Sequence, residues 1–406
     1  MTVAGTGPSG PYAARRPSLR DGNLRQVLRA VADSDEPLSR AGVAAVTGLT
    51  RSTVSRLVDD LVVARLLDEL EPRQGPGRGR PGTPLAPGSR VAALGLQVNP
   101  GYLAARVIDL RGRTVAQRYV AADLEQSDPA TTLRRLGTMA RRLVRSLPTG
   151  LRLVGAGVAL PGIVSVADAR VLSAPNLGWA DVGVADLLRG RLGGLTLQIG
   201  NEADLAARTV AEESPGRGGR LTDFLYVSGE VGIGGAAVVG GRVFPGRHGW
   251  AGEIGHISVD PMGPRCRCGS TGCLEQYAGL HAVLAAAGLP PDASVDLLLE
   301  RVRSGDPAAR GAIEAAARAL GVALASAVNV LDIPTIVLGG HLAAAADVLQ
   351  PLLERELDGR VLSAAWGSVV VDVAPDDPAP GATGAACAVL GALIDDPAGW
   401  MTPRAG

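Results

Sequence analysis

Three cysteines lie close together in the segment CRCGSTGC, from Cys266 to Cys273, and His256 precedes that segment by ten residues. Three thiolates and one imidazole form a Cys3His set, which satisfies the tetrahedral preference of a structural zinc ion with no open position. Cys266 and Cys268 are too close in sequence for an easy mutual disulfide, and two glycines let the backbone turn tightly. The sequence therefore predicts a loop folded around zinc, with His256, Cys266, Cys268 and Cys273 as ligands. The alternative is a set of buried, reduced thiols.

The fourth cysteine and the overall composition agree with a reducing compartment. Cys387 stands alone in a segment with helical periodicity, where a core position explains it. No stretch approaches the roughly 18 to 20 uninterrupted apolar residues of a membrane helix, and the Arg-containing start lacks the apolar core of a signal peptide. We therefore expect a cytoplasmic protein with no membrane partner, whose clustered cysteines bind metal rather than form disulfides.

The length and the charge distribution indicate several folded domains, one of which favours an anionic partner. A chain of 406 residues is long enough for two or three domains, each with its own core. The net charge is zero, and all 40 positively charged side chains are arginine. The first 90 residues nevertheless carry 13 Arg against nine acidic residues. This asymmetry favours an anionic partner at the amino-terminal end.

The amino-terminal segment has the pattern of a helix-turn-helix module. Residues 1–17 lack periodicity and contain several Gly and Pro, so we expect a disordered leader. A first helix follows, with an apolar stripe of Leu24, Val27, Leu28 and Val31. Ser39 can cap a short second helix, which Gly48 ends. Thr50 can cap a third helix that runs to about Leu61. Two short helices around a glycine-containing turn are typical of DNA-binding helix-turn-helix domains.

The third predicted helix has one apolar face and one polar face. Small hydroxyls and arginines on the polar face suit phosphates and base edges in a major groove. The basic, glycine-rich segment from Arg73 to Arg80 then has the pattern of a wing that contacts the sugar-phosphate backbone. The predicted DNA contacts are Arg51, Ser52, Thr53, Ser55, Arg56, Arg78 and Arg80. We assign a winged helix-turn-helix domain of the α+β class to residues 18–80 and a Pro/Gly-rich linker to residues 81–90. The alternative is a small helical bundle used for protein contacts.

From Val91 onward the sequence changes to an alternating α/β pattern. Residues 94–98, 103–108 and 114–119 have the pattern of three consecutive strands, and a turn joins the last two. Helices and strands alternate after that, up to a final helix at about residues 383–393. The larger part of the chain is therefore of the α/β class.

Several polar residues stand out in this region because their surroundings are apolar or rich in glycine. Glu253 in AGEIGH and Glu275 in CLEQY flank the predicted zinc loop, so a bound ion would fix both carboxylates. Carboxylates accept hydrogen bonds from vicinal hydroxyls, which sugars offer. Asn176 lies in a loop restricted by proline, and Asn201 and Glu202 lie at a strand-to-helix junction. Taken alone, these last residues are equally explained as a turn and a helix N-cap.

Taken together, these motifs resemble the ROK family, named for repressors, open reading frames and kinases. The matching segments follow the family order from about residue 91 onward: LPGIVS, APNLGW, NEADLAA, GIGGAAVV, HGWAGEIGH through CRCGSTGCLE, and IVLGG. The resemblance implies an actin-like (ribonuclease-H-like), two-lobed sugar-kinase fold of the α/β class. It implies a small lobe at residues 91–196, together with the C-terminal helix at 383–406, and a large lobe at 197–382 that carries the zinc site.

The resemblance also implies a sugar site in the cleft between the lobes. The implied sugar ligands are Asn176, Asn201, Glu202, Glu253, His256 and Glu275. His256 then serves both zinc and sugar, with one ring nitrogen each, which the distinct chemistry of the two nitrogens allows. A winged helix-turn-helix in front of such a domain is the arrangement of the family's regulators.

The phosphate-binding motifs of the family's kinases are altered in this chain. Gln97 stands where the kinases' DxGGT turn has Asp, and Asn99 and Pro100 replace its paired glycines. In the second phosphate loop, Glu230 and Val231 replace the Gly-Thr of GTGIGG, which adds negative charge and removes a hydroxyl donor. Glu202 matches the kinases' catalytic Asp and is one methylene longer, so this residue alone does not exclude catalysis.

The sequence therefore predicts a sugar-responsive, DNA-binding transcriptional regulator of the repressor kind, without kinase activity. Its expected partners are a double-stranded DNA operator, a sugar or sugar derivative, and further copies of itself in a dimer or tetramer. Xylose, glucose and amino sugars all fit the pattern. One alternative is an ATP-dependent sugar kinase with an atypical phosphate site. Another is a sugar sensor that contacts other proteins instead of DNA.

Overall fold

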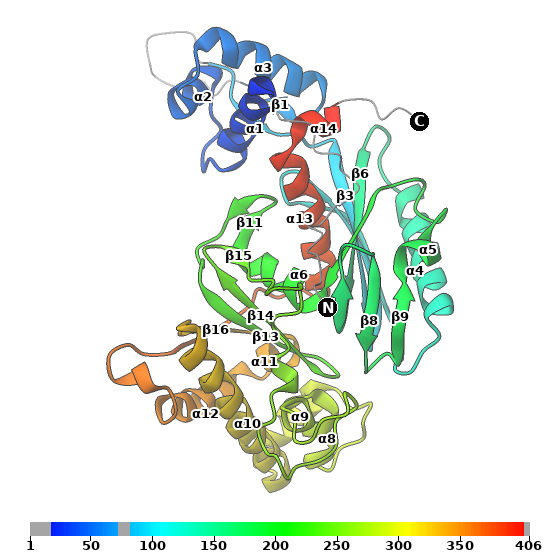
Figure 1. Ribbon diagram of the computed structural model, residues 1–406, viewed down its shortest axis with the longest axis vertical. Coiled ribbons are helices and arrows are strands. Elements are labelled where there is room, and N and C mark those ends of the chain that lie inside the picture. The colour runs from blue at the N-terminus through cyan, green and yellow to red at the C-terminus, as the bar shows by residue number, and fades with distance from the viewer. Residues whose placement is uncertain (1–17, 72–81, 402–406) are drawn as a thin grey trace, which may run out of the picture.

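The computed structural model describes residues 18–71 and 82–401, which form three parts along the longest axis of the molecule (Figure 1). The amino-terminal helical module, in blue, lies at one end, and two α/β lobes follow it. Helix α13 (Pro380–Asp395), in red, runs from between the lobes to the helical module. The predicted leader at residues 1–17 lies outside the described residues, as does the predicted wing with Arg78 and Arg80.

The amino-terminal module folds as the three predicted helices and a two-stranded sheet. Its elements are α1 (Leu19–Ala32), α2 (Arg40–Thr47), α3 (Arg51–Val63), β1 (Leu67–Glu69) and β2 (Leu85–Pro87). Ser18, Ser39 and Thr50 cap the three helices, because their side-chain oxygens accept hydrogen bonds from free backbone amides. Gly48 ends α2 in the left-handed conformation, with φ at 71°. The apolar stripe of α1 is buried against α2 and α3.

The prediction of a linker at residues 81–90 is wrong, because part of this segment is a strand of the winged module. β2 pairs antiparallel with β1, from Leu67 opposite Pro87 to Glu69 opposite Leu85. Leu85 is fully buried, and its amide donates a hydrogen bond to the carbonyl of Leu38. Prolines are tolerated here because a two-stranded ribbon has edge positions whose amides need no partner. The α/β region therefore follows the second wing strand directly.

The first lobe is built on a five-stranded sheet of order β10-β6-β3-β4-β5. These strands are β3 (Val91–Asn99), β4 (Tyr102–Asp109), β5 (Thr114–Ala121), β6 (Arg152–Leu160) and β10 (Leu197–Asn201). The three predicted strands are confirmed as the antiparallel meander β3-β4-β5, and β6 and β10 join it in parallel. The expected start of the large lobe at residue 197 therefore falls one strand early, because β10 belongs to this sheet.

A smaller sheet extends the first lobe toward the second. It consists of β7 (Ile163–Ser165), β8 (Arg170–Ala174) and β9 (Trp179–Gly183), followed by α5 (Val184–Leu188). The loop between β8 and β9 carries Asn176. Trp179, which follows this loop, is buried, and its indole N–H donates a hydrogen bond to the Ser127 carbonyl. The small sheet therefore holds the Asn176 loop in place.

Two helices cover opposite faces of the first sheet. α4 (Pro129–Arg145) packs on one face, and α13 lies on the other, over Gly95 of β3 and its neighbour Gly157 of β6. A Cβ atom on these glycines would lie 1.8 and 2.3 Å from the carbonyl oxygens of Ala382 and Ala385 in α13. Only glycine allows this approach, so the glycine pair sets how closely α13 packs on the sheet.

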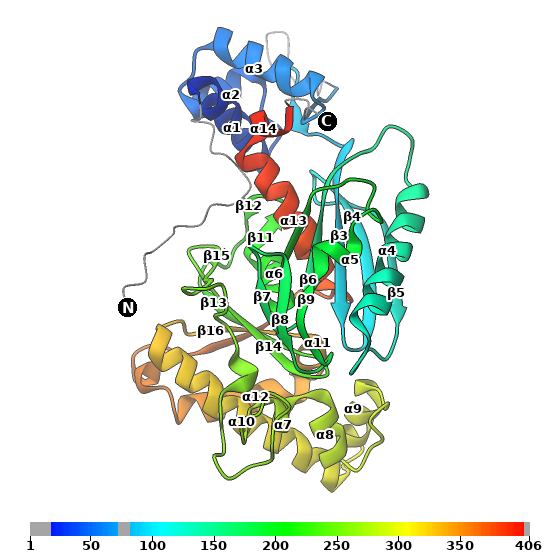
Figure 2. The ribbon, with the colours of Figure 1, turned by 45° about the vertical axis from the view of Figure 1, so that its right-hand side comes forward.

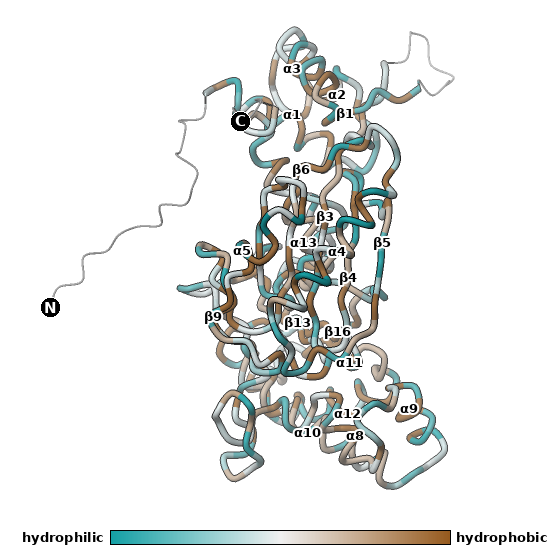
Figure 3. The backbone as a smooth tube through the Cα atoms, turned by 90° about the vertical axis from the view of Figure 1, so that its right-hand side faces the viewer, coloured by the Kyte–Doolittle hydropathy of each residue, from teal (hydrophilic) through white to brown (hydrophobic). Residues whose placement is uncertain are grey.

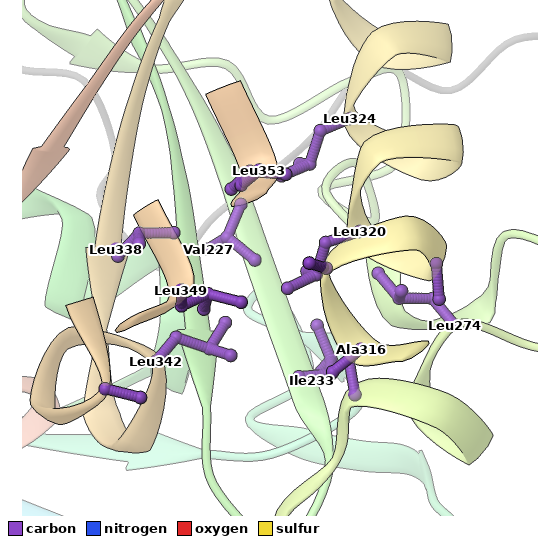
Figure 4. Close-up of a cluster of buried hydrophobic side chains, with 14 of the residues drawn as sticks. Val227, Ile233, Leu274, Ala316, Leu320, Leu324, Leu338, Leu342, Leu349 and Leu353 are labelled. Carbon is purple, nitrogen blue, oxygen red and sulfur yellow. The ribbon is translucent and has the colours of Figure 1, made fainter. Parts of the chain in front are cut away.

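The second lobe is built on a sheet of order β15-β14-β13-β16-β17. These strands are β13 (Phe224–Gly229), β14 (Ile233–Val239), β15 (Arg242–Val243), β16 (Thr335–Gly339) and β17 (Val370–Val373). One face packs on α6 (Glu202–Ala211) and the other on a group of helices, of which α10 (Pro307–Leu331) and α12 (Ala346–Asp358) are the longest. Figure 4 shows this core, with Val227 and Ile233 of the sheet near Leu320 of α10.

Helix α10 is the central helix of the second lobe. Among the described helices it is the one long and apolar enough to cross a membrane, by length and composition alone. However, 67% of its apolar window is buried inside the protein, as expected of a core helix. The shorter helices beside it are α7 (Glu275–Ala278), α8 (Leu280–Ala286), α9 (Val295–Arg303) and α11 (Gly340–Ala344).

The winged module and the first lobe share one hydrophobic core. Leu28 of α1 and Leu61 of α3 belong to the same buried cluster as Leu390 of α13. Figure 2 shows the end of α13 against α1, and in Figure 3 apolar stretches, in brown, recur from the module to the central strands. At the rim of this core, Asp395 at the end of α13 pairs with Arg29 of α1 at 2.5 Å. The module is therefore packed onto the lobe, not tethered to it.

The shared core predicts that the module and the first lobe unfold together. Replacing the fully buried Leu390 by Ala should lower the free energy of unfolding by about 2 to 5 kcal/mol, because apolar contact is lost and a cavity remains. Urea unfolding followed by circular dichroism and by Trp fluorescence should give one transition, shifted to lower urea. Leu362→Ala, at a position 82% exposed, is the control and should change stability by less than about 1 kcal/mol. Two separate unfolding transitions, one of which keeps the wild-type urea midpoint, would contradict the shared core.

Candidate sugar cleft, metal cluster and DNA-facing helix

A cleft of about 780 Å³, its open mouth included, lies between the two lobes. Its polar lining consists of Gln97, Asn99, Asn176, Asn201, Glu202, Ser228, Glu230, Glu253, His256 and Glu275. All six residues predicted to bind sugar thus line a single cleft. The structure adds Ser228, which lies at the end of β13 and which the sequence motifs did not single out.

Next to the cleft, the side chains of His256, Cys266, Cys268 and Cys273 converge. Their ligand atoms all lie within 4.8 Å of one another. The two Sγ atoms of Cys268 and Cys273 are 3.7 Å apart, and Sγ of Cys266 is 3.8 Å from Nδ1 of His256. Tetrahedral zinc with Zn–S bonds of about 2.3 Å places neighbouring sulfur atoms about 3.8 Å apart. The four residues therefore fit a metal ion such as zinc.

Tight turns and a buried anchor hold the cysteine loop in this shape. Gly272 has φ at +67°, and a Cβ atom there would lie 1.6 Å from the carbonyl oxygen of Asp260. The Cys266 amide donates to the carbonyl of Ser270 at 2.9 Å. Leu274, directly after Cys273, is fully buried in the core of the second lobe (Figure 4). The loop is thus fixed to the lobe beside its last cysteine.

His256 presents its two ring nitrogens in different directions. Nδ1 faces Cys266, whereas Nε2 lies 3.8 Å from a carboxylate oxygen of Glu253. Burial raises the pKa of Glu253, the positive charge of His256 lowers it, and the carboxylate of Glu275 raises it. One nitrogen is therefore placed for a metal, and the other faces a carboxylate that lines the cleft.

Glu275 and Asn176 connect the two lobes across the cleft. Glu275 begins α7 and is buried; its Oε2 atom accepts hydrogen bonds from Asn176 Nδ2 at 3.1 Å and from the Ile233 amide at 3.3 Å. Nearby, Glu125 of the first lobe pairs with Arg267 of the second. A ligand that competes for the Asn176 or Glu275 side chain would therefore change the contact between the lobes.

Asn201 caps helix α6, which is one of the two interpretations that the sequence allowed. Its Oδ1 atom accepts from the amides of Ala203 and Asp204 at 2.7 and 3.2 Å, and its Nδ2 atom donates to the Gly162 carbonyl. Most of its hydrogen-bonding capacity is therefore used locally. Asp204 was not singled out, although burial and the nearby Glu253 raise its pKa to about 7. Its place two residues after Glu202 is its one signal in the sequence.

The other end of the cleft contains residues that depart from the kinase motifs. Gln97 Nε2 donates to the Tyr102 hydroxyl at 2.9 Å and to a Glu202 carboxylate oxygen at 3.4 Å. Asn99 Nδ2 donates to the same carboxylate oxygen at 3.3 Å. Burial raises the pKa of Glu202 to about 7, although the two amide donors lower it. Here the two amide side chains hold a carboxylate.

Glu230 follows β13 and places its carboxylate beside Gly340, the first residue of α11. Burial raises the pKa of Glu230 to about 8, and the nearby carboxylate of Glu202 adds to this effect. Within residues 18–71 and 82–401, no hydrogen bond or ion pair to the Glu230 carboxylate is present. Two carboxylates therefore lie close together at this end, and one of them has no partner.

Helix α3 presents Arg51, Ser52 and Arg56 to solvent. Ser55 faces inward, because its carbonyl and hydroxyl oxygens each accept a hydrogen bond from Arg40 of α2 at 3.0 Å. The Thr53 hydroxyl lies 2.8 Å from that of the capping residue Thr50. Ser55 thus orients α3 against α2. No sequence pattern predicts the contacts of Arg40, because they arise only when the helices pack.

Comparison with known proteins identifies the family. The model of the ROK family matches residues 94–392, and a MarR family model matches residues 25–79. The chain belongs to the ROK family. It is 26% identical over 342 residues to the xylose repressor of Bacillus subtilis strain 168, which covers 84% of this chain and 86% of that protein. The predicted winged helix-turn-helix followed by an actin-like ROK fold is confirmed.

Solved structures of both regulators and kinases share this fold. A ROK family transcriptional regulator, a homologue of the Escherichia coli MLC protein, has a TM-score of 0.75 and 24% identity, with 93% of this chain and 97% of that chain covered. A ROK family glucokinase from Streptomyces griseus, solved with glucose and AMPPNP, has a TM-score of 0.62 and 27% identity, with 73% and 98% covered. The fold alone therefore does not distinguish a regulator from a kinase. The residues of the site must make this distinction.

The ligand geometry predicts about one bound metal ion per chain. Cys268→Ser should lose most of this metal, because it removes one of the ligands, and the exposed position of Cys268 keeps packing effects small. Inductively coupled plasma mass spectrometry of the purified protein measures the ratio and identifies the element. Cys387→Ala, in α13, is the control and should keep the metal. Full metal content in the Cys268 variant would refute this site.

Proposed function

We propose that this chain is a sugar-responsive, DNA-binding transcriptional regulator of the repressor kind that acts in the cytoplasm. The observation that carries the proposal is that α13 borders the cleft at one end and the winged module at the other. Pro380 lines the cleft, and the Ala382 amide donates a hydrogen bond to Gln97 Oε1 at 3.0 Å. Leu390 lies in the core that the winged module shares. One helix therefore joins a polar cleft to a DNA-binding fold.

In this proposal, sugar binding shifts an equilibrium between two arrangements of the lobes. Asn176 and Glu275 link the lobes, so a sugar that uses them has a different affinity for open and closed forms. Because α13 packs tightly on Gly95 and Gly157, it moves with the first sheet and not along it. A coupling free energy of about 1 to 3 kcal/mol would change operator affinity roughly 5- to 150-fold. This route through packed side chains replaces the flexible linker that the sequence suggested.

We assign DNA contact to the exposed face of α3, with Arg51, Ser52 and Arg56 toward the major groove and Thr53 near its amino end. The predicted contacts of Arg78 and Arg80 lie outside the described residues. Proteins of this type read paired half-sites, so the proposed active form is a homodimer or tetramer on a double-stranded operator. The third interpretation, a sensor that contacts other proteins, has no observation that favours it.

We assign zinc to the Cys3His cluster, in a structural role. Three thiolates and an imidazole fill the four positions of tetrahedral zinc, so no position is open to a substrate. When bound, the ion supplies a rigid cross-link. Glu253 lies three residues before His256, and Glu275 lies two residues after Cys273, so this cross-link would fix both carboxylates in the cleft wall. Nε2 of His256 would then be free to donate to a sugar oxygen.

We further propose that the sugar is bound and not phosphorylated. Asn176, Glu253 and Glu275 offer hydrogen-bonding groups to hydroxyls at the metal end of the cleft. At the other end, Pro100 lacks an amide donor and an ionised Glu230 adds a negative charge, so two positions that serve a nucleotide's phosphates in the family's kinases are unsuited to them here. The kinase alternative rests on the shared fold and on Glu202, which occupies the position of the kinases' catalytic Asp.

The DNA proposal predicts that Arg56→Ala weakens both operator affinity and sequence preference, by about 1 to 3 kcal/mol if Arg56 reaches a base edge. An operator selected from a random duplex library provides the probe, and fluorescence anisotropy at several salt concentrations measures affinity. Arg135→Ala, which removes an exposed arginine from α4, is the matched control and should bind normally. Loss of salt-sensitive affinity alone would make Arg56 a phosphate contact. Unchanged binding would remove α3 from the interface.

The sensor proposal predicts that a sugar changes operator affinity without being phosphorylated. A thermal-shift screen of xylose, glucose and amino sugars identifies the effector, because ligand binding raises the melting temperature. Anisotropy with the same sugar should then show a change within about 5- to 150-fold, and a coupled ATP assay should show no turnover. Glu275→Gln should lose the sugar effect yet still bind the operator. Turnover at about 1 to 100 per second would establish a kinase instead.

A further inference from the structure

The cleft has an unusual charge for a site that belongs to a sugar-kinase fold. Four carboxylates line it, those of Glu202, Glu230, Glu253 and Glu275. No arginine is among its described lining residues, and the chain contains no lysine. His256 is the one basic side chain in the described lining, and it lies at the metal end. At a pH above the raised pKa values of Glu202 and Glu230, this end of the cleft therefore carries negative charge without a cation to balance it.

The two carboxylates at this end differ in what they still can bind. Glu202 accepts hydrogen bonds from Gln97 and Asn99, at 3.4 and 3.3 Å, so two of its acceptor positions are filled. Glu230 has no such donor among the described residues and lines the open cleft. A carboxylate in a partly desolvated cleft is stabilised by a hydrogen-bond donor, and a ligand with a hydroxyl or ammonium group supplies one. Glu230 thus favours a ligand with a hydroxyl or ammonium group at this position.

A phosphate group has the opposite properties. A phosphate monoester carries about −1.5 to −2 charges at neutral pH and offers mainly acceptor oxygens. Beside the ionised carboxylates of Glu202 and Glu230 it would meet like charge in a partly desolvated cleft, where such repulsion is stronger than in water. Arginine or lysine usually binds phosphate in proteins, and neither lines this cleft. Gln97 directs its side-chain N–H groups to Tyr102 and Glu202, and Asn99 directs one of its two to Glu202.

We propose that Glu202 and Glu230 make the cleft selective for an unphosphorylated sugar, with a hydroxyl or amine at this end, and exclude the phosphate ester of the same sugar. This inference rests on the proposed function, because it names the class of effector that the same cleft takes. Glu230 is the main specificity-determining residue, since its carboxylate is the one left without a donor. The regulator would then report a free sugar and ignore the product of that sugar's phosphorylation.

Isothermal titration calorimetry with four matched pairs tests this inference. The probes are glucose, mannose, glucosamine and N-acetylglucosamine, each beside its 6-phosphate ester, in magnesium-free buffer at about pH 8.5, where the phosphate is fully ionised. For the sugar that binds, the wild type should prefer the free form by at least about tenfold. Glu230→Gln should reduce this preference several-fold, and so should Glu202→Gln, because each removes a negative charge and keeps the side-chain shape.

Glu314→Gln is the matched control, because it removes the same charge from an exposed position on α10 and should leave the preference unchanged. Thermal unfolding of each variant checks that it is folded, and either cleft variant alone is sufficient for the test. A wild type that binds a phosphate ester as tightly as its free sugar overturns the inference but leaves the proposed function standing. Binding of none of the eight probes, together with an operator that responds to no sugar, overturns the proposed function itself.

Discussion

The close contact between α13 and the glycine pair Gly95 and Gly157 is the constraint on which the arrangement of this protein depends. Because no side chain separates the helix from the sheet, the helix can reach the cleft with its first turn and the winged module with its last. A larger residue at either glycine would push α13 away from the sheet and separate both ends from their partners. Sensing and DNA contact therefore depend on one packing distance.

A metal ion in the cysteine cluster would hold two carboxylates in fixed positions on an irregular loop. Side chains on irregular segments lose more rotamer and backbone freedom when they bind a ligand than side chains on a rigid element do. Here Glu253 and Glu275 lie next to cluster residues in the chain, and Leu274 anchors the loop in the core of the second lobe. A metal ion bound at four points would remove most of that freedom before a sugar arrives.

The sequence predicted those features that depend on neighbouring residues and missed those that depend on packing. Capping residues Ser39 and Thr50 predict the helix starts, and three runs of strand-forming residues predict the strands β3, β4 and β5, because both signals are local. The sequence predicts a linker where strand β2 lies, since its prolines and glycines suggest a loop and only pairing with β1 makes it a strand. Likewise, Ser55 faces inward because its hydroxyl accepts a hydrogen bond from Arg40, and no local sequence pattern links these two residues.

The acidic end of the cleft shows how one fold can serve two functions. A kinase must stabilise negative charge on a transferring phosphoryl group, so carboxylates without donors at that position would oppose its chemistry. A sensor has no such requirement and can keep a partly buried carboxylate such as Glu230, whose raised pKa reflects a cost of ionising it in the cleft. Proteins retain such costs at sites where binding recovers them. In the proposed function, a donor ligand recovers part of this cost, so the same residue that opposes phosphoryl transfer makes ligand binding a stabilising event, which is the property a sensor requires.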